Sequence, residues 1–522
     1  MKSIRILSCF ILMGCCMPVN TYGRKVEKIA LNSVKITGGK ISGKAGSDAK
    51  VLVFKGIPFA APPIGEFRWK APQPVASWKG TKKCDTFGPS AWQNPPVPFL
   101  VYTKEFLIPA EPFGEDCLYL NVWTTATSTS DHRPVIVFIH GGAFMSGSGS
   151  VPIYNGESMA KKGIVFVTIN YRVGIFGFFA HPELTKESGH QASGNYGILD
   201  QIAALKWVKQ NITAFGGNPD NVTIAGQSAG SMSVNALAAS RLAKGFFHRM
   251  IAESGASVVK GAFGGTESLA TAEAKGVEIA RTAGVSSIAD LRNKPAAVIG
   301  KLLKGMGAVI VDGYVLQATI PEVFAKGELA DVPLLTGWNG DDALFNAPAT
   351  VASYREYLKN LFGSDAENIF KFYPASNDEE ATLAQKQLSR DSGFGIQNYA
   401  WARMQAEKGK SKAFLYFFER KVPETGGTNQ YGAFHTAEVP YAYDNLRFLN
   451  RPLEPADHEL AKLISSYWVN FASTGDPNGA GLPIWPSFRP GGGETMRFNT
   501  VSSAGKQPNS EALEFLLQRM KK

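Results

Sequence analysis

The chain has 522 residues, of which 44% are hydrophobic and 19% are charged. This composition can fill a large buried core, and it excludes an intrinsically disordered protein, which combines few apolar residues with a high net charge. Lys and Arg outnumber Asp and Glu by 54 to 44, which gives a formal net charge of +10. The basic residues are scattered along the chain instead of forming a basic helix or arm, so we expect no nucleic-acid partner.

The N-terminal residues have the pattern of an export signal. Lys2 and Arg5 precede an apolar run over residues 6–17, and small residues ending at Gly23 suit a cleavage site. The run of about 12 residues is too short for a membrane span, which needs about 20. The sequence therefore predicts a signal peptide over residues 1–23, no stable membrane span, and a bacterial protein exported to the periplasm or the extracellular space.

A lipoprotein interpretation of the same segment stays open. The residues before Cys15 read Leu-Met-Gly, and the four together resemble a bacterial lipobox. Processing there would leave Cys15 as a lipidated N-terminus and anchor the protein in the outer membrane. The two interpretations agree on export and differ in whether the mature chain is tethered.

Cysteine usage indicates a disulfide in the mature chain. Removal of the leader takes away Cys9, Cys15 and Cys16, so that Cys84 and Cys117 remain. An even pair of cysteines in an exported protein predicts a bridge between them. Two buried thiols are the alternative.

The order of the predicted elements is typical of an α/β protein. Short strands broken by glycines are expected over residues 35–57, and a long loop rich in Pro and aromatic residues over 58–115. Apolar, β-rich segments predict buried strands at 118–123, 135–139, 164–169, 222–225, 250–252, 332–336 and 413–418. Helices are expected at 200–215, from 229, at 457–474 and from 510, with helical insertions at 266–330 and 351–410. This alternation predicts one domain over residues 24–522, with helices on both faces of a large, mostly parallel, twisted sheet.

A candidate nucleophile lies in the segment Gly226-Gln-Ser-Ala-Gly230, between a predicted strand and a predicted helix. A strand that turns sharply into a helix leaves little room for side chains beside the turn, which explains a glycine near each side of Ser228. Such a turn exposes the Ser hydroxyl, and the helix N-terminus behind it favours a developing negative charge. The pattern predicts that Ser228 attacks a carbonyl carbon.

A second glycine-rich turn supplies candidate hydrogen-bond donors. His140-Gly-Gly-Ala-Phe144 follows the predicted strand at 135–139. Successive backbone N–H groups in such a turn can converge on one oxygen atom, as in the HGGG-type loops of ester hydrolases. The N–H groups of Gly142, Ala143 and Ala229 are therefore predicted to form an oxyanion hole. The sequence has no cysteine–histidine cluster at zinc spacing, and we expect neither a metal nor a cofactor.

These motifs resemble the type-B carboxylesterases of the α/β-hydrolase superfamily, the group that contains bacterial para-nitrobenzyl esterases and animal cholinesterases. The stretch Phe215-Gly-Gly-Asn-Pro-Asp-Asn-Val-Thr-Ile-Ala-Gly-Gln-Ser-Ala-Gly is similar to the family's serine signature, and Glu115-Asp-Cys-Leu-Tyr-Leu-Asn-Val to its second signature. Segments beginning at Asn170, Gly194 and Tyr467 also resemble the family. The likeness extends from about residue 30 to near the C-terminus. It implies an α/β-hydrolase fold, with helical insertions over the active site, and esterase activity.

The resemblance also implies the partners of Ser228, because the family's triad follows the order Ser, acid, His. Of the seven histidines, His435 lies where the family places its catalytic base, after the predicted strand at 413–418. Asp342 takes the position at which the family usually has Glu. An Asp can also orient the imidazole and stabilise the imidazolium. Asp341 is the rival for this role.

Two departures from the family pattern bear on specificity and on the disulfide. Gln227 precedes the nucleophile, where cholinesterases and many relatives carry Glu, so the resemblance argues against choline esters. The family's upstream disulfide cysteine usually stands just before a Gln, whereas this stretch reads Ser90-Ala-Trp-Gln93 and Cys84 lies earlier. A bridge from Cys84 to Cys117 would therefore need a shifted loop.

The sequence thus predicts an exported serine carboxylesterase that hydrolyses esters with aryl or short-to-medium acyl groups through an acyl-enzyme. The residues expected to line an apolar substrate gorge are Phe99, Phe106, Phe113, Gln227 and Trp338, and core packing is the alternative for the aromatic ones. Small esters are the expected partners of a monomer or weak oligomer. Other hypotheses move the substrate to an amide, a lactone, a polyester or a plant-wall aryl ester, or make the chain a catalytically inactive adhesion or binding protein.

Overall fold

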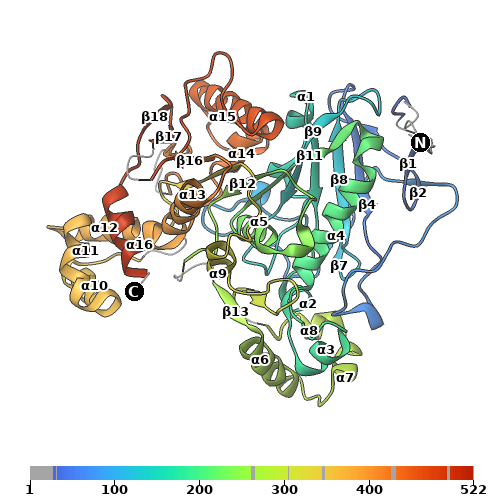
Figure 1. The fold of residues 1–522 in the computed structure, drawn as a ribbon, viewed down its shortest axis with the longest axis horizontal. Helices are drawn as coiled ribbons and strands as arrows, with labels where there is room; N and C mark the ends of the chain where they lie inside the picture. Colours follow the sequence, from blue (N-terminus) through green and yellow to red (C-terminus); the bar gives the residue numbers. More distant parts are fainter. Residues whose placement is uncertain are drawn as a thin grey trace, which may run out of the picture.

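A large twisted sheet runs through the middle of the computed structural model (Figure 1). The structure describes residues 27–30, 32–259, 265–303, 305–343, 347–424, 431–490 and 494–520. The predicted signal peptide over residues 1–23 and the predicted lipid site at Cys15 lie outside these described residues. Among the helices of the described ranges, none combines the length and the hydropathy that crossing a bilayer requires.

Within the described ranges, eleven strands form this sheet, in the spatial order β18-β17-β16-β15-β12-β11-β9-β10-β8-β4-β3. They are β3 Lys44–Ala45, β4 Leu52–Pro58, β8 Tyr119–Thr124, β9 Arg133–Ile139, β10 Val165–Ile169, β11 Gly217–Gln227, β12 Arg249–Glu253, β15 Leu334–Asn339, β16 Ala413–Phe418, β17 Glu494–Phe498 and β18 Ser503–Lys506. The seven strands from β17 to β10 in this order are parallel to one another. At the edges, β8, β4, β3 and β18 are attached antiparallel. The sheet is therefore mixed, with a parallel centre, and the α/β prediction is confirmed.

Helices surround the sheet and build the insertions. They are α1 Glu157–Lys161, α2 Gly174–Phe178, α3 Pro182–Glu187, α4 Tyr196–Asn211, α5 Ala229–Ala239, α6 Leu269–Thr282, α7 Ile288–Arg292, α8 Ala296–Ile299, α9 Ile320–Ala325, α10 Val351–Phe362, α11 Ala366–Phe372, α12 Asp378–Arg390, α13 Ile396–Lys408, α14 Val439–Ala442, α15 Pro455–Thr474 and α16 Ser510–Met520. The predicted insertions at 266–330 and 351–410 contain α6 to α9 and α10 to α13. In Figure 1, α6 to α8 lie at the lower edge of the view, and α10 to α12 lie at the left beside α16.

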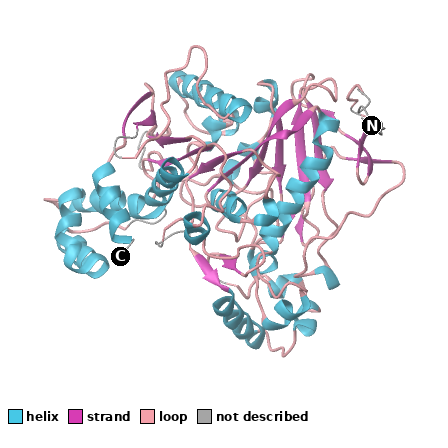
Figure 2. Cartoon of the chain, in the orientation of Figure 1, coloured by secondary structure: helices cyan, strands magenta, loops and turns pink. Residues whose placement is uncertain are grey.

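The continuously apolar strands at the centre of the sheet are buried on both faces. Residues 135–139 of β9 have no solvent exposure. Successive side chains of a strand point to opposite faces, and the odd-numbered ones join a hydrophobic cluster with α4, α5 and α13. The even-numbered ones join a second cluster with α1, α14 and α15. Helices accordingly lie on both sides of the strands in Figure 2, which is why these strands carry no polar alternation.

Short strands outside the main sheet lie partly in the region 35–57, where the sequence predicts short strands, and partly in regions that it predicts as a loop or an insertion. β1 Val34–Ile36, β2 Gly39–Ser42 and β5 Thr81–Lys83 form a three-stranded sheet, while β6 Ser90–Ala91 pairs with β7 Phe113–Gly114, and β13 Thr266–Ser268 pairs with β14 Val309–Val311. The long predicted loop at 58–115 thus contains three brief strands. They are too short to leave a periodic pattern in the sequence.

The structure corrects the prediction of a disulfide between Cys84 and Cys117, because both residues are free, buried thiols. The backbone of Cys84 is tied to the sheet edge: its N–H donates to the Ser42 carbonyl and its carbonyl accepts from Lys55. Burial raises the pKa of both thiols, that of Cys84 to about 11. The thiols are therefore protonated and weakly reactive, in agreement with the alternative that the sequence left open.

Candidate active site

Ser228 stands between the last residue of β11 and the first residue of α5. Its φ of 58° and ψ of −123° form a conformation that costs energy for a residue other than glycine. Its N–H donates to the Glu253 carbonyl at 2.8 Å, which ties the turn to β12. The two glycines of the motif are needed because a Cβ on Gly226 would lie 2.5 Å from the Gly230 carbonyl carbon, and a Cβ on Gly230 would collide with β9.

His435 and Asp342 come from two loops that follow neighbouring strands. A parallel bridge pairs Asp341 with Phe434, so the loop after β15 and the loop that carries His435 run side by side. His435 Nδ1 lies 2.5 Å from Asp342 Oδ1, and both side chains are buried. The backbone N–H of Asn339 donates to Asp342 Oδ2 at 3.1 Å. The carboxylate is thus fixed on one oxygen and faces the imidazole with the other.

The rival carboxylate, Asp341, has a different set of contacts. Its Oδ1 pairs with Lys386 Nζ at 2.6 Å, and its Oδ2 accepts the Ala433 N–H at 2.8 Å. These contacts join the loop after β15 to α12 and to the loop that precedes His435. Asp341 therefore supports the two loops, whereas Asp342 contacts the imidazole.

The side chain of Gln227 reaches the other nitrogen of the imidazole. Its Nε2 lies 3.1 Å from His435 Nε2, and the side chain is buried. An amide nitrogen only donates, so this contact needs a lone pair on the imidazole Nε2 and places the ring proton on Nδ1, facing Asp342. The two ring nitrogens are engaged by Asp342 and Gln227, and the Ser228 hydroxyl has to compete with the amide for Nε2.

Sequence reasoning missed two aromatic residues that hold His435. The Phe394 ring stacks on the imidazole with 4.5 Å between ring centroids and 14° between planes. The Tyr102 hydroxyl donates to the His435 backbone carbonyl at 2.9 Å. Phe394 lies in a π-helical turn at Asp391–Gly395, between α12 and α13. Neither residue belongs to a motif, so their aromatic character was the one available signal.

The turn after β9 faces the nucleophile. Gly142 and Ala143 have positive φ values of 114° and 55°, and both line the same cavity as Ser228 and Ala229. The carbonyls of the described turns and loops take up none of the N–H groups of Gly142, Ala143 and Ala229. The three N–H groups remain the predicted donors to an oxyanion beside Ser228.

His140, at the start of this turn, is a structural residue. Its Nδ1 lies 2.9 Å from the Gly141 carbonyl, and its ring stacks on Tyr171 with 4.3 Å between centroids. The Tyr171 hydroxyl donates to the His140 carbonyl at 2.8 Å. Burial lowers the pKa of His140 to about 4, so the ring is neutral at physiological pH. A neutral ring adds no charge beside the predicted oxyanion hole.

A cavity of about 650 Å³ opens beside Ser228 and His435. The large apolar side chains on its wall are those of Trp92, Val97, Phe99, Leu100, Phe106, Leu107, Ile108, Met145, Val151, Ile175, Phe176, Met232, Leu303, Met306 and Phe394. The Gln227 amide also lines it, as the sequence predicted. Among the described residues of the wall there is no Asp, Glu, Lys or Arg. The cavity therefore suits an apolar, uncharged molecule of the size of a small ligand.

Two residues expected in the gorge lie elsewhere. Trp338 has no exposed surface and packs against Phe417 at 5.7 Å in the cluster below α13. Because side chains alternate along β15, Trp338 points into that core, and its predicted role in substrate binding is corrected. Phe113 packs against Trp92 at 5.2 Å. The wall, as far as the structure describes it, contains neither Trp338 nor Phe113.

Comparison with known proteins agrees with this fold. The sequence model of the carboxylesterase family matches residues 30–516, and the chain belongs to this family. Its fold is that of the α/β-hydrolases, and it is a carboxylic ester hydrolase of the serine type.

Individual relatives are similar over most of their length. The chain is 36% identical over 488 residues to the fumonisin B1 esterase of Sphingopyxis macrogoltabida, a match that covers 88% of this chain and 86% of the relative. It is 34% identical over 506 residues to the para-nitrobenzyl esterase of Bacillus subtilis (strain 168), covering 91% and 96%. A solved structure of a PNB esterase matches with a TM-score of 0.78 and 31% identity, covering 93% of this chain and 100% of that one.

Proposed function

We propose that this chain hydrolyses carboxylic esters through an acyl-enzyme on Ser228, with His435 as general base and Asp342 as the carboxylate that orients the imidazole. The observation that carries the proposal is the 2.5 Å contact between His435 Nδ1 and Asp342 Oδ1, beside the cavity that also contains Ser228. A hydroxyl on a strained turn and a base oriented by a carboxylate thus line one cavity, which supports nucleophilic acyl transfer.

Acylation begins when His435 Nε2 takes the proton of Ser228 as Oγ bonds to the ester carbonyl carbon. The carbonyl oxygen becomes an oxyanion, which accepts hydrogen bonds from the three N–H groups of the predicted oxyanion hole. Asp342 stabilises the imidazolium that has formed. The imidazolium then gives its proton to the alcohol oxygen as the C–O bond breaks, so that the alcohol leaves and the acyl group stays on Ser228.

Deacylation repeats these steps with water. His435 takes a proton from water as the water oxygen bonds to the acyl carbon, and the same donors hold the second oxyanion. The imidazolium returns its proton to Ser228 Oγ as the acyl bond breaks, which releases the carboxylic acid. Activity should fall in acid, because a protonated imidazole cannot accept the Ser proton; an ordinary imidazole is protonated below roughly pH 6 to 7.

The proposed substrates are uncharged esters with aryl or short-to-medium acyl groups. The apolar wall of the cavity supports this choice, since none of its described residues offers a side-chain carboxylate or a Lys or Arg cation to a charged substrate. The neutral amide of Gln227 lines the cavity where a carboxylate would favour a cationic alcohol. Choline esters are therefore expected to be poor substrates.

Export is proposed from the sequence alone. The charged and apolar pattern over residues 1–23 supports cleavage as a signal peptide, or lipidation at Cys15. A single domain over residues 24–522, and a monomer or weak oligomer, also stay predictions.

Hydrolysis of a p-nitrophenyl ester series from acetate to laurate, with Ser228→Ala as the blank, tests the proposed function. We expect turnover by the wild type and a loss of kcat by about a millionfold in the variant, because the acyl group then has no nucleophile. The preferred chain length should fall at short-to-medium acyl groups. Absence of turnover by folded wild-type protein on every ester would favour the inactive binding protein, and unchanged turnover in Ser228→Ala would exclude Ser228 as the nucleophile.

A further inference from the structure

A glutamate lies three residues after the proposed base, directly before α14. This residue, Glu438, is 2% exposed. Its Oε2 accepts the Asn339 side-chain amide at 2.5 Å, and its Oε1 lies 3.5 Å from the hydroxyls of Ser254 and Tyr416. The carboxyl group is therefore held in one place, and no Lys or Arg of the part of the chain that the structure describes pairs with it.

Asn339 connects this glutamate to both partners of the proposed nucleophile. Its side-chain amide also donates to the Phe434 carbonyl at 2.8 Å, directly before His435. Its backbone N–H donates to Asp342 Oδ2 at 3.1 Å. Asn339 thus joins Glu438, the segment that carries the base and the carboxylate that orients it. A change of charge on Glu438 would act on the Asp342–His435 pair through this connection.

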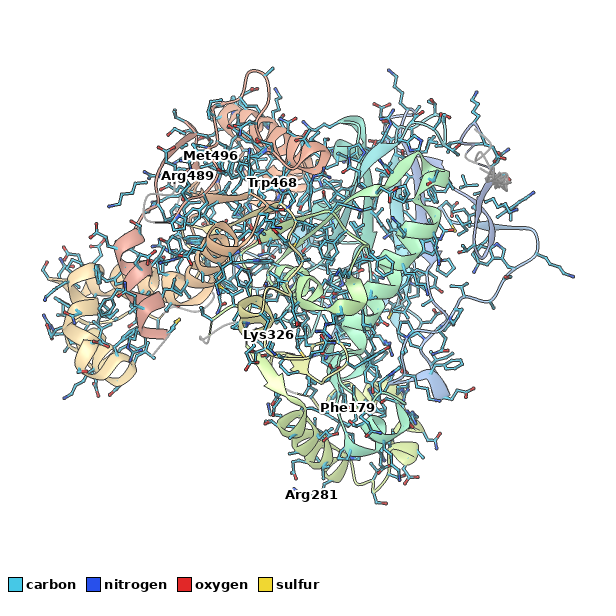
Figure 3. All side chains as sticks on the ribbon, in the orientation of Figure 1. Phe179, Arg281, Lys326, Trp468, Arg489 and Met496 are labelled. Carbon is cyan, nitrogen blue, oxygen red and sulfur yellow. The ribbon has the colours of Figure 1, made fainter. Side chains whose placement is uncertain are left out.

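A second buried glutamate lies behind the first. Glu253 ends β12 and has no solvent exposure, and its backbone carbonyl is the acceptor for the Ser228 N–H. Its Oε1 accepts the Trp468 indole N–H at 2.9 Å, and its Oε2 accepts the Tyr443 hydroxyl at 3.3 Å. Trp468, labelled in Figure 3, belongs to α15. Burial of this carboxyl group away from water favours the neutral acid, whereas the hydrogen bonds from Trp468 and Tyr443 oppose this by favouring the carboxylate.

These carboxyl groups have little positive charge around them. The titratable groups that act on Glu438 and Glu253 from the surrounding elements are Tyr102, Tyr154, Tyr416, Tyr443, Asp342 and His435. Burial holds the pKa of each of these tyrosines above its usual value, so they are neutral. Among these described groups, the imidazole is the one that can become positive. Three buried carboxylates against one imidazole cannot all be ionised at neutral pH.

The contacts indicate which glutamate keeps its proton. Burial, and then Glu438, raise the pKa of Glu253 well above its usual range. Burial, and then Asp342, raise the pKa of Glu438 to about 7, while Asn339 and His435 oppose this rise. Glu438 has a short amide hydrogen bond and lies three residues from His435, so a negative charge is better placed on Glu438 than on Glu253.

We propose, on the basis of the function proposed above, that Glu253 stays protonated while Glu438 ionises beneath the Asp342–His435 pair, and that Glu438 is a positioning residue which sets the pH range in which His435 acts as a base. The proton that Glu438 loses goes to solvent, and no covalent bond changes. Ionised Glu438 favours the imidazolium form of His435. This effect stabilises the transition state of acyl transfer, but it also means that His435 loses its proton only at a higher pH. The two ionisations are therefore coupled and appear together in the acid limb of the activity profile.

The same chemical change at the two glutamates should have different effects. We would measure kcat/KM for p-nitrophenyl butyrate against pH in the wild type, Glu438→Gln and Glu253→Gln. Gln at position 438 removes a negative charge, so the acid limb should move to lower pH by about one unit and follow a single ionisation, with a plateau about tenfold lower. Gln at position 253 replaces a group that is already neutral, so both the limb and the plateau should stay close to those of the wild type.

A direct titration of the imidazole tests the inference without relying on activity. In protein labelled with ¹³C-histidine, the His435 signal, assigned through His435→Gln, should show two coupled inflections in the wild type and one in Glu438→Gln. Asp312→Asn is the matched control at a buried carboxylate that accepts backbone N–H groups elsewhere, and it should leave the His435 titration unchanged.

Three results would overturn the inference: a single inflection of the wild-type His435 signal, an acid limb that Glu438→Gln does not move, or an equal shift in Glu253→Gln. The titration of His435 in the wild type tests the inference even if a variant does not fold. Failure of the proposed function is distinguishable, because it would abolish wild-type ester turnover while leaving the two inflections of His435 in place.

Discussion

Asp200 and Asp342 are both buried carboxylates close to the sheet, but their partners differ in kind. Asp200, in α4, accepts the Arg172 side chain at 2.7 and 2.8 Å and the Arg172 backbone N–H at 3.0 Å. Both residues of that pair have almost no solvent exposure. Asp342 instead faces His435 at 2.5 Å. A guanidinium carries its charge at every accessible pH, whereas an imidazole gains and loses it near neutrality.

This difference separates a structural carboxylate from one that can take part in proton transfer. With Arg172, the charge of Asp200 is balanced permanently, so the pair joins α4 to the segment after β10 and has no reason to change state. With His435, the charge of Asp342 is balanced only when the imidazole is protonated. Acyl transfer creates that imidazolium, so Asp342 should contribute to the rate and Asp200 to the stability of the fold.

Asp342→Asn should give the largest effect among the changes to these carboxylates. The amide cannot stabilise an imidazolium, and its NH₂ group can favour the wrong tautomer of His435. We expect kcat to fall by about ten thousandfold with little change in the thermal unfolding midpoint. The measurement is turnover of p-nitrophenyl butyrate in variants whose folding is checked by circular dichroism.

The matched control for this change is Asp341→Asn, one residue earlier. Its contacts with Lys386 and Ala433 are structural, so kcat should stay within about tenfold of the wild type. If the loss is larger in Asp341→Asn than in Asp342→Asn, Asp341 is the catalytic acid and the alignment with the family's Glu is displaced by one residue.

Asp200→Asn should have its main effect on stability. Removal of the carboxylate leaves the Arg172 guanidinium buried without a counter-charge, which costs about 3 to 5 kcal/mol of the free energy of unfolding. Urea unfolding followed by tryptophan fluorescence measures this loss, and kcat of the folded variant should stay near the wild-type value. A variant of unchanged stability that has lost turnover would contradict the structural role and remove the contrast with Asp342.

The main architecture could be predicted from the sequence because the parallel strands are continuously apolar. The strand expected at 413–418 is β16, and the one expected at 135–139 is the buried part of β9. The helix expected from residue 200 begins at Tyr196 instead, and its N-cap residue, Asn195, makes no side-chain cap hydrogen bond. The antiparallel pairing of β8 with β10 was not foreseeable, because a strand buried on both faces reads the same in either direction.

The candidate site was predictable where chemistry demands particular residues at particular positions. The glycines around Ser228 and the family's residue order pointed to two further loops, and the structure brings His435 and Asp342 of these loops into contact. Trp338 was misplaced because its distance along the chain from Asp342 says nothing of which face of β15 it occupies. Phe394 and Glu438 were missed since their roles depend on tertiary contacts between segments that are far apart in the sequence.

Gln227→Glu would place a second carboxylate beside the imidazole, on the side opposite Asp342. Its oxygens would lie where the amide nitrogen now approaches His435 Nε2 at 3.1 Å. A carboxylate there favours the imidazolium, so His435 loses its proton at higher pH and the acid limb of kcat/KM should move up by about one unit. This direction is opposite to that expected for Glu438→Gln. Gln227→Met, which keeps the length and adds no charge, should leave the limb unmoved.

The same variant also tests why the cavity should disfavour cationic esters. Butyrylcholine and 3,3-dimethylbutyl butyrate have nearly the same shape and differ in the charge of the alcohol group. The wild type, with a neutral amide at position 227, should hydrolyse the neutral ester with the higher kcat/KM. In Gln227→Glu the ratio should shift toward the choline ester by about tenfold, since one nearby opposite charge contributes on the order of 1 kcal/mol. An unchanged ratio together with an unmoved acid limb would mean that the side chain at position 227 faces neither the imidazole nor the alcohol group during turnover.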